Sequence, residues 1–287
     1  MTSRIVVVGC GIFGVTAAVE LRRRGHQVRV LEAGGLPHPE AASTDISKVV
    51  RMEYGTDTDY MRLVAESRDL WLEWNERWRY RGQPELYHET GVVMLSRDEM
   101  APGGYEHDSY RTLLDHGHTP ERIGGTELAE RFPAWSGESF ADGFFHAVGG
   151  YGESGLVVWA LAEEARRNGA EILEGRPVTR LLETGGRVSG VEDATGERHQ
   201  ADQVVVANGS WAAELLPGLA DSLQRTYHPV WHLRPERPEL FRAEVFPVFT
   251  ADVARTGYYG FPLHPVHSVV KIGHHAGPIE ADAEPGP

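Results

Sequence analysis

The feature that most constrains the fold of this chain is a glycine pattern enclosed by a strand and a helix. The sequence Arg-Ile-Val-Val-Val at 4–8 has the length and β-branched character of a buried parallel strand. Gly9-Cys10-Gly11-Ile12-Phe13-Gly14 follows directly, and residues 12–24 predict a helix. A second strand is predicted at 27–31. Together these segments form a β-α-β unit of about 30 residues, which predicts an α/β fold with a parallel sheet.

Each glycine of this pattern has a physical role in holding an adenine dinucleotide. Gly9 permits a tight turn, Gly11 lets the pyrophosphate approach the backbone, and Gly14 lets the helix pack close to the strand. The free N–H groups and the dipole of the helix favour the phosphates. Glu32 ends the second strand, where its carboxylate can accept hydrogen bonds from ribose hydroxyls. The pattern predicts a bound adenine dinucleotide, but it leaves FAD and NAD open, and a glycine-rich turn without ligand is the alternative.

The charge, the apolar segments and the cysteine content of the chain argue against several classes of partner and site. With 28 Lys+Arg and 42 Asp+Glu, the net charge is −14, which disfavours nucleic acid and anionic membranes as partners. The apolar run 5–19 is shorter than the roughly 20 residues that span a bilayer, and it lacks a small-residue cleavage site, so it predicts structure rather than targeting. The single cysteine excludes an internal disulfide framework and a cysteine-based zinc cluster. It fits a reducing, cytoplasmic setting.

The remaining segments predict two interleaved domains. After a loop at 34–47, residues 59–80 predict a long helix whose Leu63, Leu70, Trp71, Trp74 and Trp78 indicate helix packing. Shorter helices are predicted at 110–114, 126–131 and 156–168. Strands are predicted at 91–95, 171–173, 178–183, 188–192, 203–206, 245–249, 257–261 and 268–272. We therefore expect a discontinuous Rossmann-like domain for the cofactor (1–90 and 146–218) with an inserted, mostly antiparallel substrate domain (91–145 and 219–287).

Five segments together resemble the FAD-dependent amine oxidase family, which includes monomeric sarcosine oxidase, N-methyltryptophan oxidase and the fructosyl-amino-acid oxidases. They are the glycine pattern, Lys-Val-Val-Arg-Met-Glu-Tyr-Gly at 48–55, residues 204–211, Tyr-Tyr-Gly-Phe-Pro at 258–262 and Lys-Ile-Gly-His-His at 271–275. The segments come in the family's order and span nearly all 287 residues. The resemblance implies a Rossmann-like FAD domain with a mostly antiparallel substrate domain above the flavin.

The resemblance also implies which residues bind FAD. They are Gly9, Gly11, Ile12, Phe13, Gly14, Glu32, Ala33, Ser43, Thr44, Lys48, Val178, Asn208, Gly209 and Trp211. Ser43, Thr44 and Lys48 fall in the loop that runs past the isoalloxazine in the family. Sarcosine oxidases carry arginine at the position of Lys48. The lysine and the preceding Asp-Ile-Ser look closer to the fructosyl-amino-acid and pipecolate oxidase branch, so the amine substrate stays open.

Four further residues match catalytic and substrate-binding positions of the family. Arg51 matches the arginine that holds the substrate carboxylate, which a guanidinium fork suits, and a surface ion pair with Glu53 or a neighbour is the alternative. Tyr259 and His275 match residues that line the substrate pocket, with satisfied core residues as the alternative. Lys271 matches the lysine near flavin N5 that assists oxygen, because a fixed cation favours the anion that O₂ forms. A solvated side chain is the alternative for Lys271.

The implied reaction is hydride transfer from the carbon next to a neutral secondary amine to flavin N5, followed by hydrolysis of the imine and reduction of O₂ to hydrogen peroxide. The expected partners are a small-molecule amine and O₂, with the oligomeric state open. Family members continue past Lys271 with strands, a helix, a flavin-linking cysteine and a second substrate-binding lysine. We expect this C-terminal portion to be missing and the FAD to be non-covalent.

Other functions compete with this prediction. A D-amino-acid or glycine oxidase-like FAD enzyme shares the superfamily, and a truncated, catalytically silent flavin-binding protein would retain the cofactor alone. An NAD-linked dehydrogenase fits the glycine pattern but not the later segments. A metal site at His264, His267, His274 and His275 is disfavoured, because their spacing is not an established ligand pattern and no carboxylates accompany them, so no metal is predicted.

Overall fold

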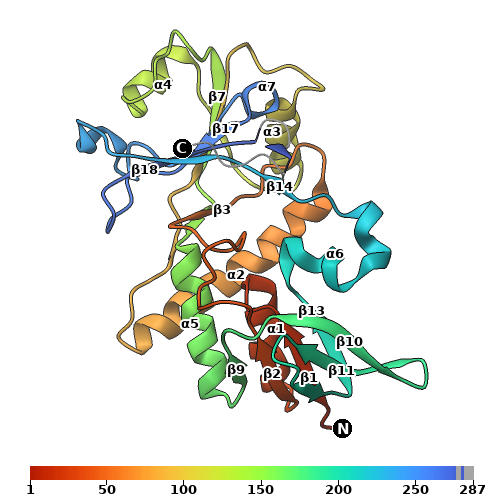
Figure 1. Ribbon diagram of the computed structural model, residues 1–287. Helices are drawn as coiled ribbons and strands as arrows, with labels where there is room; N and C mark the ends of the chain where they lie inside the picture. The colour runs from red at the N-terminus through yellow and green to blue at the C-terminus, as the bar shows by residue number, and fades with distance from the viewer. Residues whose placement is uncertain (276–278, 281–287) are drawn as a thin grey trace. The chain divides into compact units, whose positions relative to one another are not determined.

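The computed structural model describes residues 1–275 and 279–280 of the chain. The chain divides into two compact units (Figure 1). Unit 1 comprises residues 1–46 and 153–225, and unit 2 comprises residues 47–152 and 226–287. Both units are discontinuous in sequence, but their boundaries differ from those expected at 90, 145 and 218. The largest difference is the segment 47–90, which belongs to unit 2.

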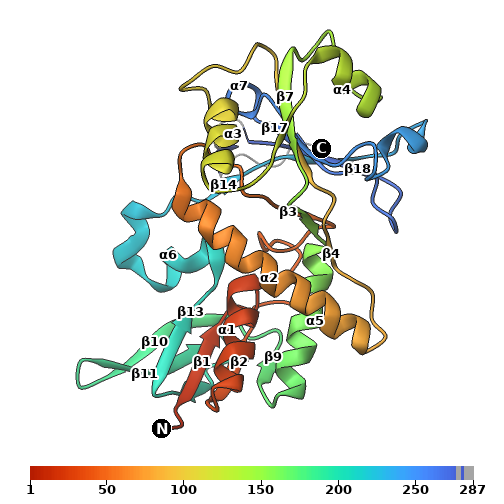
Figure 2. The same ribbon diagram turned by 180° about the vertical axis from the view of Figure 1, so that it is seen from behind.

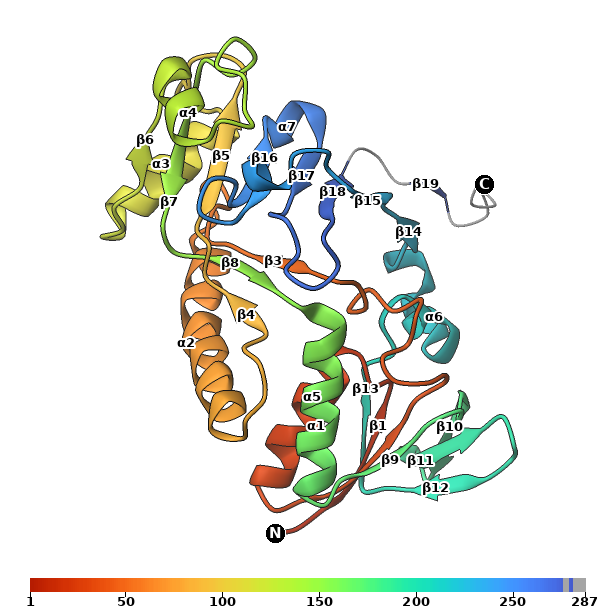
Figure 3. The ribbon, with the colours of Figure 1, turned by 90° about the vertical axis from the view of Figure 1, so that its left-hand side faces the viewer.

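Unit 1 is built on a parallel sheet in the order β13-β1-β2-β9. Its strands are β1 (Arg4–Val8), β2 (Gln27–Leu31), β9 (Glu171–Leu173) and β13 (Gln203–Val206). Helix α1 (Ile12–Arg23) connects β1 to β2 and packs beside α5 (Ser154–Arg167), as Figure 3 shows. The predicted β-α-β unit is confirmed, with the helix one residue shorter than expected.

Different elements bury the two faces of this parallel sheet. Val7 is fully buried and lies close to Gly14 of α1. Val6 and Val8 point to the opposite face, because side chains alternate along a strand, and they join an apolar cluster that includes Val191. That cluster includes residues of β10 (Val178–Thr184), β11 (Arg187–Asp193) and α6 (Ala212–Leu215). Strands β10 and β11 form an antiparallel sheet with β12 (Arg198–Gln200). Short 3₁₀ segments, η1 (Gly209–Trp211) and η2 (Pro217–Ser222), flank α6.

Unit 2 contains a seven-stranded sheet in the order β15-β18-β17-β16-β5-β7-β6. Its strands are β5 (Val92–Ser96), β6 (Glu121–Arg122), β7 (Asp142–His146), β15 (Val230–Leu233), β16 (Val248–Ala251), β17 (Tyr258–Gly260) and β18 (Val270–His274). Each neighbouring pair is antiparallel except β16 and β5, which run parallel. The mostly antiparallel sheet predicted from the sequence is therefore confirmed.

Apolar clusters cover both faces of the seven-stranded sheet. Val92 and Met94 of β5 belong to one cluster, together with residues of α2 (Thr58–Tyr80) and α3 (Tyr105–Asp115). Val93 and Leu95 belong to the other, together with residues of α4 (Gly125–Arg131). All four of these β5 side chains are buried, which explains why the strand is a continuous apolar run rather than an alternating one.

Three short strands explain why the segment 47–90 belongs to unit 2. They are β3 (Lys48–Val50), β4 (Tyr87–His88) and β8 (Gly150–Gly152), and they form a separate sheet in the order β3-β8-β4. Both β3 and β4 pair antiparallel with β8. Strands of two or three residues carry no periodic signal, so the sequence reasoning placed the boundary after the segment instead of before it.

Helix α2, orange in Figure 2, connects β3 to β4 along the chain. Asp57 caps it, since its carboxylate accepts hydrogen bonds from the N–H groups of residues 59 and 60. The ring of Trp71 stacks on Tyr87 of β4 at 5.6 Å, and Trp78 is buried, so the predicted packing role of the tryptophans is confirmed. The leucines expected beside them, Leu63 and Leu70, are instead about half exposed.

The other described elements are small. Strand β14 (Thr226–Tyr227) pairs with β19 (Ile279–Glu280), and η3 (Pro238–Phe241) and α7 (Val253–Thr256) lie in the segments around β16. Among the described residues, no helix combines the length and the apolar character that a membrane span requires.

We predict that Asn75 of α2 is a main contributor to the stability of this region. Its buried amide donates to the carbonyl of Tyr87 at 2.6 Å and accepts from the N–H groups of Leu86 and Tyr87. Asn75→Leu would leave three buried backbone groups unpaired and should lower the free energy of unfolding by about 3 kcal/mol. Urea unfolding measures the change, and Glu66→Ala on the exposed face of the same helix should cost under about 0.5 kcal/mol. Equal effects of the two variants would contradict this role.

Candidate functional site

The glycine pattern forms a turn in which a side chain has no space at two positions. Gly9 has a φ of +92°, and a Cβ on it would lie 2.7 Å from the carbonyl oxygen of Ala207. A Cβ on Gly14 would lie 1.9 Å from the carbonyl oxygen of Gly9, which confirms that Gly14 permits close packing of helix on strand. A Cβ on Gly11 would meet only the Ser43 hydroxyl, at 3.1 Å. The backbone at Gly11 is therefore bare apart from that hydroxyl.

The Ser43 hydroxyl also contacts the start of α1. It accepts a hydrogen bond of 2.9 Å from the N–H of Ile12. The structure thus brings Ser43, which the resemblance assigns to FAD, to the helix N-terminus that the glycine pattern predicts for the phosphates. The neighbouring Phe13 is largely exposed.

Glu32 lies buried where β2 ends. One of its carboxylate oxygens accepts from the N–H of Cys10 at 2.7 Å, and the other accepts from the N–H of Gly34 at 3.2 Å. These bonds tie the end of β2 to the glycine turn. Each carboxylate oxygen has a second lone pair, so hydrogen bonds from a ribose remain feasible, and this role of Glu32 stays a prediction.

Polar atoms without partners lie in the loops beside the glycine turn. Thr44 Oγ1 and Asn208 Oδ1 are both buried, and neither has a hydrogen-bond partner among the described residues. Asn208 follows β13, and its Cα lies 2.8 Å from where a Cβ on Gly9 would be. Buried polar groups are usually paired, so these two atoms fit a ligand that carries hydrogen-bonding groups, as FAD does.

The other FAD residues implied by the resemblance occupy varied positions. Val178 begins β10 and packs against the apolar cluster of unit 1, while Ala33 and Gly209 are exposed. The Trp211 ring lies 5.8 Å from the ring of His38 and under the guanidinium of Arg225. Lys48 lies in unit 2, as an exposed residue of β3, whereas Ser43 and Thr44 lie in unit 1. The roles of these residues stay predictions.

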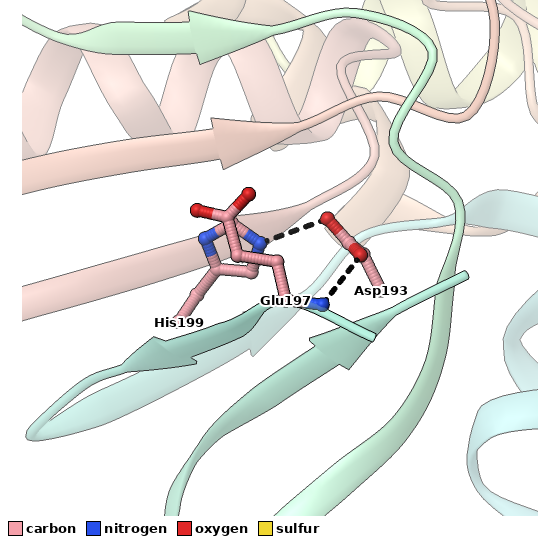
Figure 4. Close-up of side chains that lie close together, drawn as sticks. All are labelled: Asp193, Glu197 and His199. Carbon is pink, nitrogen blue, oxygen red and sulfur yellow. Dashed lines mark hydrogen bonds and ion pairs between the residues drawn. The ribbon is translucent and has the colours of Figure 1, made fainter. Parts of the chain in front are cut away.

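Asp193, Glu197 and His199 gather close enough to share a metal ion, but they already form a charge network (Figure 4). His199 Nε2 lies 3.0 Å from the carboxylate of Asp193. Arg176 Nη1 donates to both carboxylates, at 2.8 Å to Asp193 and 2.7 Å to Glu197. A cation would have to displace this guanidinium, so we assign the cluster to the packing of the β10-β11-β12 sheet. In the described part of the chain, the histidines at 264, 267, 274 and 275 form no such group.

The pKa of Asp193 follows from this network. The hydrogen bond from the Thr195 hydroxyl is the largest cause, and with those from His199 and Arg176 it holds the pKa of the Asp193 carboxyl well below its ordinary value. The carboxylate is therefore charged over the whole neutral range.

Arg51 of unit 2 is held by two tyrosines. Its Nη1 donates to the Tyr105 hydroxyl at 3.1 Å, and its guanidinium carbon lies 4.4 Å from the centre of the Tyr54 ring. The alternative of an ion pair with Glu53 is wrong, because the buried Glu53 carboxylate accepts from His146 Nδ1 at 2.7 Å. No carboxylate of the described residues pairs with Arg51, which leaves its charge available to an anionic ligand.

His275 and Tyr259 lie together in unit 2. Their rings are 5.4 Å apart, and the ring of His228 lies 4.7 Å from that of His275. Partial desolvation lowers the pKa of His275, which remains an exposed residue, and the nearby His228, Arg51 and Lys48 lower it further. The imidazole is therefore neutral at pH 7 and able to accept a hydrogen bond.

Lys271 is buried in β18, so the alternative of a solvated side chain is wrong. Its Nζ donates to the carbonyl oxygen of Ser47 at 2.5 Å and lies 4.7 Å from the centre of the Phe261 ring. A carbonyl and an aromatic face both stabilise a cation, which is how the sheet tolerates a buried lysine.

Sequence reasoning missed the contacts made around Arg51 by Tyr105 and by the Glu53–His146 pair. Tyr105, Glu53 and His146 come from α3, the loop after β3 and β7, and only the folded chain joins them. Glu53 lies in the segment 48–55 but was considered only as a partner of Arg51, Tyr105 carries no recognisable motif, and the segment 105–109 was not expected to be helical. No signal in the sequence would have found this arrangement.

We predict that His275 titrates below the ordinary histidine pKa of 6.5, for the causes given above. Arg51→Met removes one of the nearby cations and should raise the pKa of His275 towards that value. NMR titration of the imidazole signals measures both effects, with Arg62→Met on the exposed surface of α2 as the matched control. A midpoint at or above 6.5 in the unmodified protein, or no response to Arg51→Met, would contradict the arrangement.

Comparison with known proteins supplies the family. The profile of the FAD dependent oxidoreductases (DAO) matches residues 4–286. An N-methyl-L-tryptophan oxidase of Yersinia pestis is 27% identical over 287 residues, which are 99% of this chain and 73% of that relative. In fold, the chain resembles a thermally stable mutant of fructosyl peptide oxidase (TM-score 0.80, 22% identity, 95% of this chain and 64% of that one). It also resembles the L-proline dehydrogenase of P. horikoshii (TM-score 0.75, 21% identity, 96% and 70%).

The two TM-scores show that the chain shares its overall fold with these solved structures. The chain spans slightly less than two thirds of the fructosyl peptide oxidase. The profile match covers nearly every residue from the first strand onward. The chain therefore belongs to the FAD dependent oxidoreductase family.

Proposed function

We propose that the chain binds FAD and oxidises a secondary amine or an N-substituted amino acid, with O₂ reduced to hydrogen peroxide. The observation that carries the proposal is the guanidinium of Arg51, which two tyrosines hold in place while no described carboxylate neutralises it. Although the net charge of the protein is −14, this cation has no described carboxylate beside it, and a guanidinium fork suits a substrate carboxylate. The names of the relatives, which act on N-methyl-tryptophan or fructosyl peptides, support the same class of substrate.

Unit 1 is the proposed FAD-binding part of the chain. Gly9 and Gly11 provide a turn with little side-chain bulk, the start of α1 provides N–H groups for the phosphates, and Glu32 would accept from the ribose. The unpartnered atoms of Thr44 and Asn208 would gain hydrogen bonds. When bound, FAD supplies a hydride acceptor at N5 and a route for two electrons to O₂.

Unit 2 is the proposed substrate part. Arg51 would bind the carboxylate, which fixes one end of an amino-acid substrate. His275 is neutral at pH 7 and would accept a hydrogen bond from the substrate amine, with Tyr259 beside it. Lys271 would favour the reduction of O₂, because a fixed positive charge in a buried setting stabilises the anion that O₂ forms.

The proposal also includes the cellular location of the protein and its small-molecule partners. A single cysteine in 287 residues supports a reducing, cytoplasmic location. An amine and O₂ are the proposed small-molecule partners. The likeness to an L-proline dehydrogenase brings a cyclic secondary amine into the range of substrates to be tested.

An absorption spectrum of the purified chain tests the proposal first, and we expect a flavin spectrum. Sarcosine, N-methyl-L-tryptophan, a fructosyl amino acid, L-proline, D-alanine and glycine are then added without oxygen. We expect one of the secondary amines to bleach the flavin, and a peroxidase-coupled assay to detect peroxide when air returns. Absence of flavin would rule out the cofactor. Flavin that no amine bleaches would favour a silent flavin-binding protein, and bleaching by D-alanine or glycine alone would favour the D-amino-acid or glycine oxidase alternative.

We also predict that the FAD is bound without a covalent link. Burial is the main cause that raises the pKa of the Cys10 thiol to about 12, so the one cysteine of the chain offers no thiolate to the flavin. Acid precipitation should therefore release all flavin absorbance into the supernatant. Cys10→Ala should bind as much flavin as the unmodified chain, since the N–H of Cys10 and not its thiol bonds to Glu32. Flavin retained in the precipitate would refute the prediction.

A further inference from the structure

The Tyr105 hydroxyl makes two hydrogen bonds at once. It accepts from Arg51 Nη1 at 3.1 Å and donates to the backbone carbonyl of Glu53 at 2.8 Å. A hydroxyl has a single proton, so donation to Glu53 directs its lone pairs towards the guanidinium. The bond from Arg51 is thus oriented by a backbone group that cannot rotate independently.

Two residues of helix α3 contact Gly55 in the loop that carries Arg51. Tyr105 is the first residue of the helix, and its ring lies 3.2 Å from where a Cβ on Gly55 would be. Ser109, one turn later on the same face, is buried and accepts from the N–H of Gly55 at 2.8 Å. Two residues of the helix therefore hold the loop at Gly55, beside the hydrogen bonds of the Tyr105 hydroxyl.

A buried pair fixes the Glu53 carbonyl in turn. The side chain of Glu53 is fully buried, accepts from the N–H of Met52 at 3.0 Å and lies 2.7 Å from His146 Nδ1. Because this carboxylate, the nearest to Arg51 in the sequence, is bound to a histidine, it does not neutralise Arg51.

The remaining donors of Arg51 are the basis for recognition. A guanidinium has five N–H donors, and the bond to Tyr105 is the one side-chain hydrogen bond that Arg51 makes among the described residues. The guanidinium carbon lies over the Tyr54 ring, 4.4 Å from its centre, and 6.0 Å from the centre of the Tyr105 ring. An arginine that uses one nitrogen for a hydrogen bond within the protein keeps its remaining N–H donors for a bidentate contact with a carboxylate.

We propose that Tyr105 is a positioning residue for Arg51, and that its hydroxyl sets the guanidinium in the orientation that binds a substrate carboxylate. This inference rests on the proposed function, in which Arg51 binds that carboxylate. A bidentate contact requires a defined plane and direction, so an arginine that is already oriented loses less conformational entropy on binding. Tyr105 would therefore affect the recognition of an acid and leave the recognition of the corresponding neutral amide unchanged.

The test compares Tyr105→Phe with the unmodified holoprotein. The variant keeps the ring against Gly55 and removes only the hydroxyl. Two matched pairs serve as substrates: sarcosine and its carboxamide, and N-methyl-L-tryptophan and its carboxamide. We expect KM for the acid to rise roughly fivefold to tenfold with kcat little changed, which corresponds to one hydrogen bond. KM for the amide should stay the same. Calorimetric binding of indole-3-propionate and indole-3-propionamide, which contain no oxidisable amine, should show the same selective loss.

Two further variants separate the possible outcomes. Tyr110→Phe removes a hydroxyl from the same helix, where the ring packs on Phe144, and should leave every value unchanged. Arg51→Gln should abolish the preference for acid over amide.

If Arg51→Gln abolishes this preference and Tyr105→Phe does not alter it, the positioning role is refuted while the proposed function stands. Equal losses for acid and amide in Tyr105→Phe would likewise refute positioning. If Arg51→Gln keeps the preference, or if the unmodified protein binds none of the probes, the proposed role of Arg51 fails and the inference fails with it.

Discussion

The parallel pairing of β1 with β13 is the interaction on which the candidate cofactor site depends. Val8 and Val206 are partners in this register, so the two strands end at the same edge of the sheet. The glycine turn after β1 and the Ala207–Asn208 loop after β13 are thereby brought into contact although some 200 residues separate them. The requirement for glycine at position 9 arises from this contact, because the loop after β13 occupies the space that a side chain would need.

The local charge around Arg51 and Lys271 in unit 2 depends on which side chains are paired, and it differs from the net charge of the chain. The chain is strongly acidic, but the carboxylate nearest to Arg51 in sequence is buried against His146. Lys271 is stabilised by a carbonyl oxygen and an aromatic ring. The Glu53 carboxylate is thus kept from Arg51 by its contact with His146, and a local cation persists in a molecule whose net charge would repel an anion.

Sequence reasoning predicted correctly those parts of the fold that depend on a short, local pattern of residues. The β-α-β unit, the close packing at Gly14 and the mostly antiparallel sheet all follow from short-range periodicity and glycine placement. It failed for the segment 47–90, because β3, β4 and β8 are too short to show a period and owe their existence to one another. Arg51 was found through a resemblance, whereas Tyr105 lies 54 residues away and was not. Contacts of that separation leave no trace in a single sequence.

The sequence by itself determined the family, the glycine turn and the identity of the candidate cations. These depend on residue type and local order, which the chain carries before it folds. Only the tertiary structure decided that Lys271 is buried, that Glu53 is paired with His146 rather than with Arg51, and that a tyrosine of α3 accepts a hydrogen bond from the guanidinium. The physical reason is that burial and hydrogen-bond partners depend on which segments the sheets bring together, and the pairing of distant strands is a property of the whole chain.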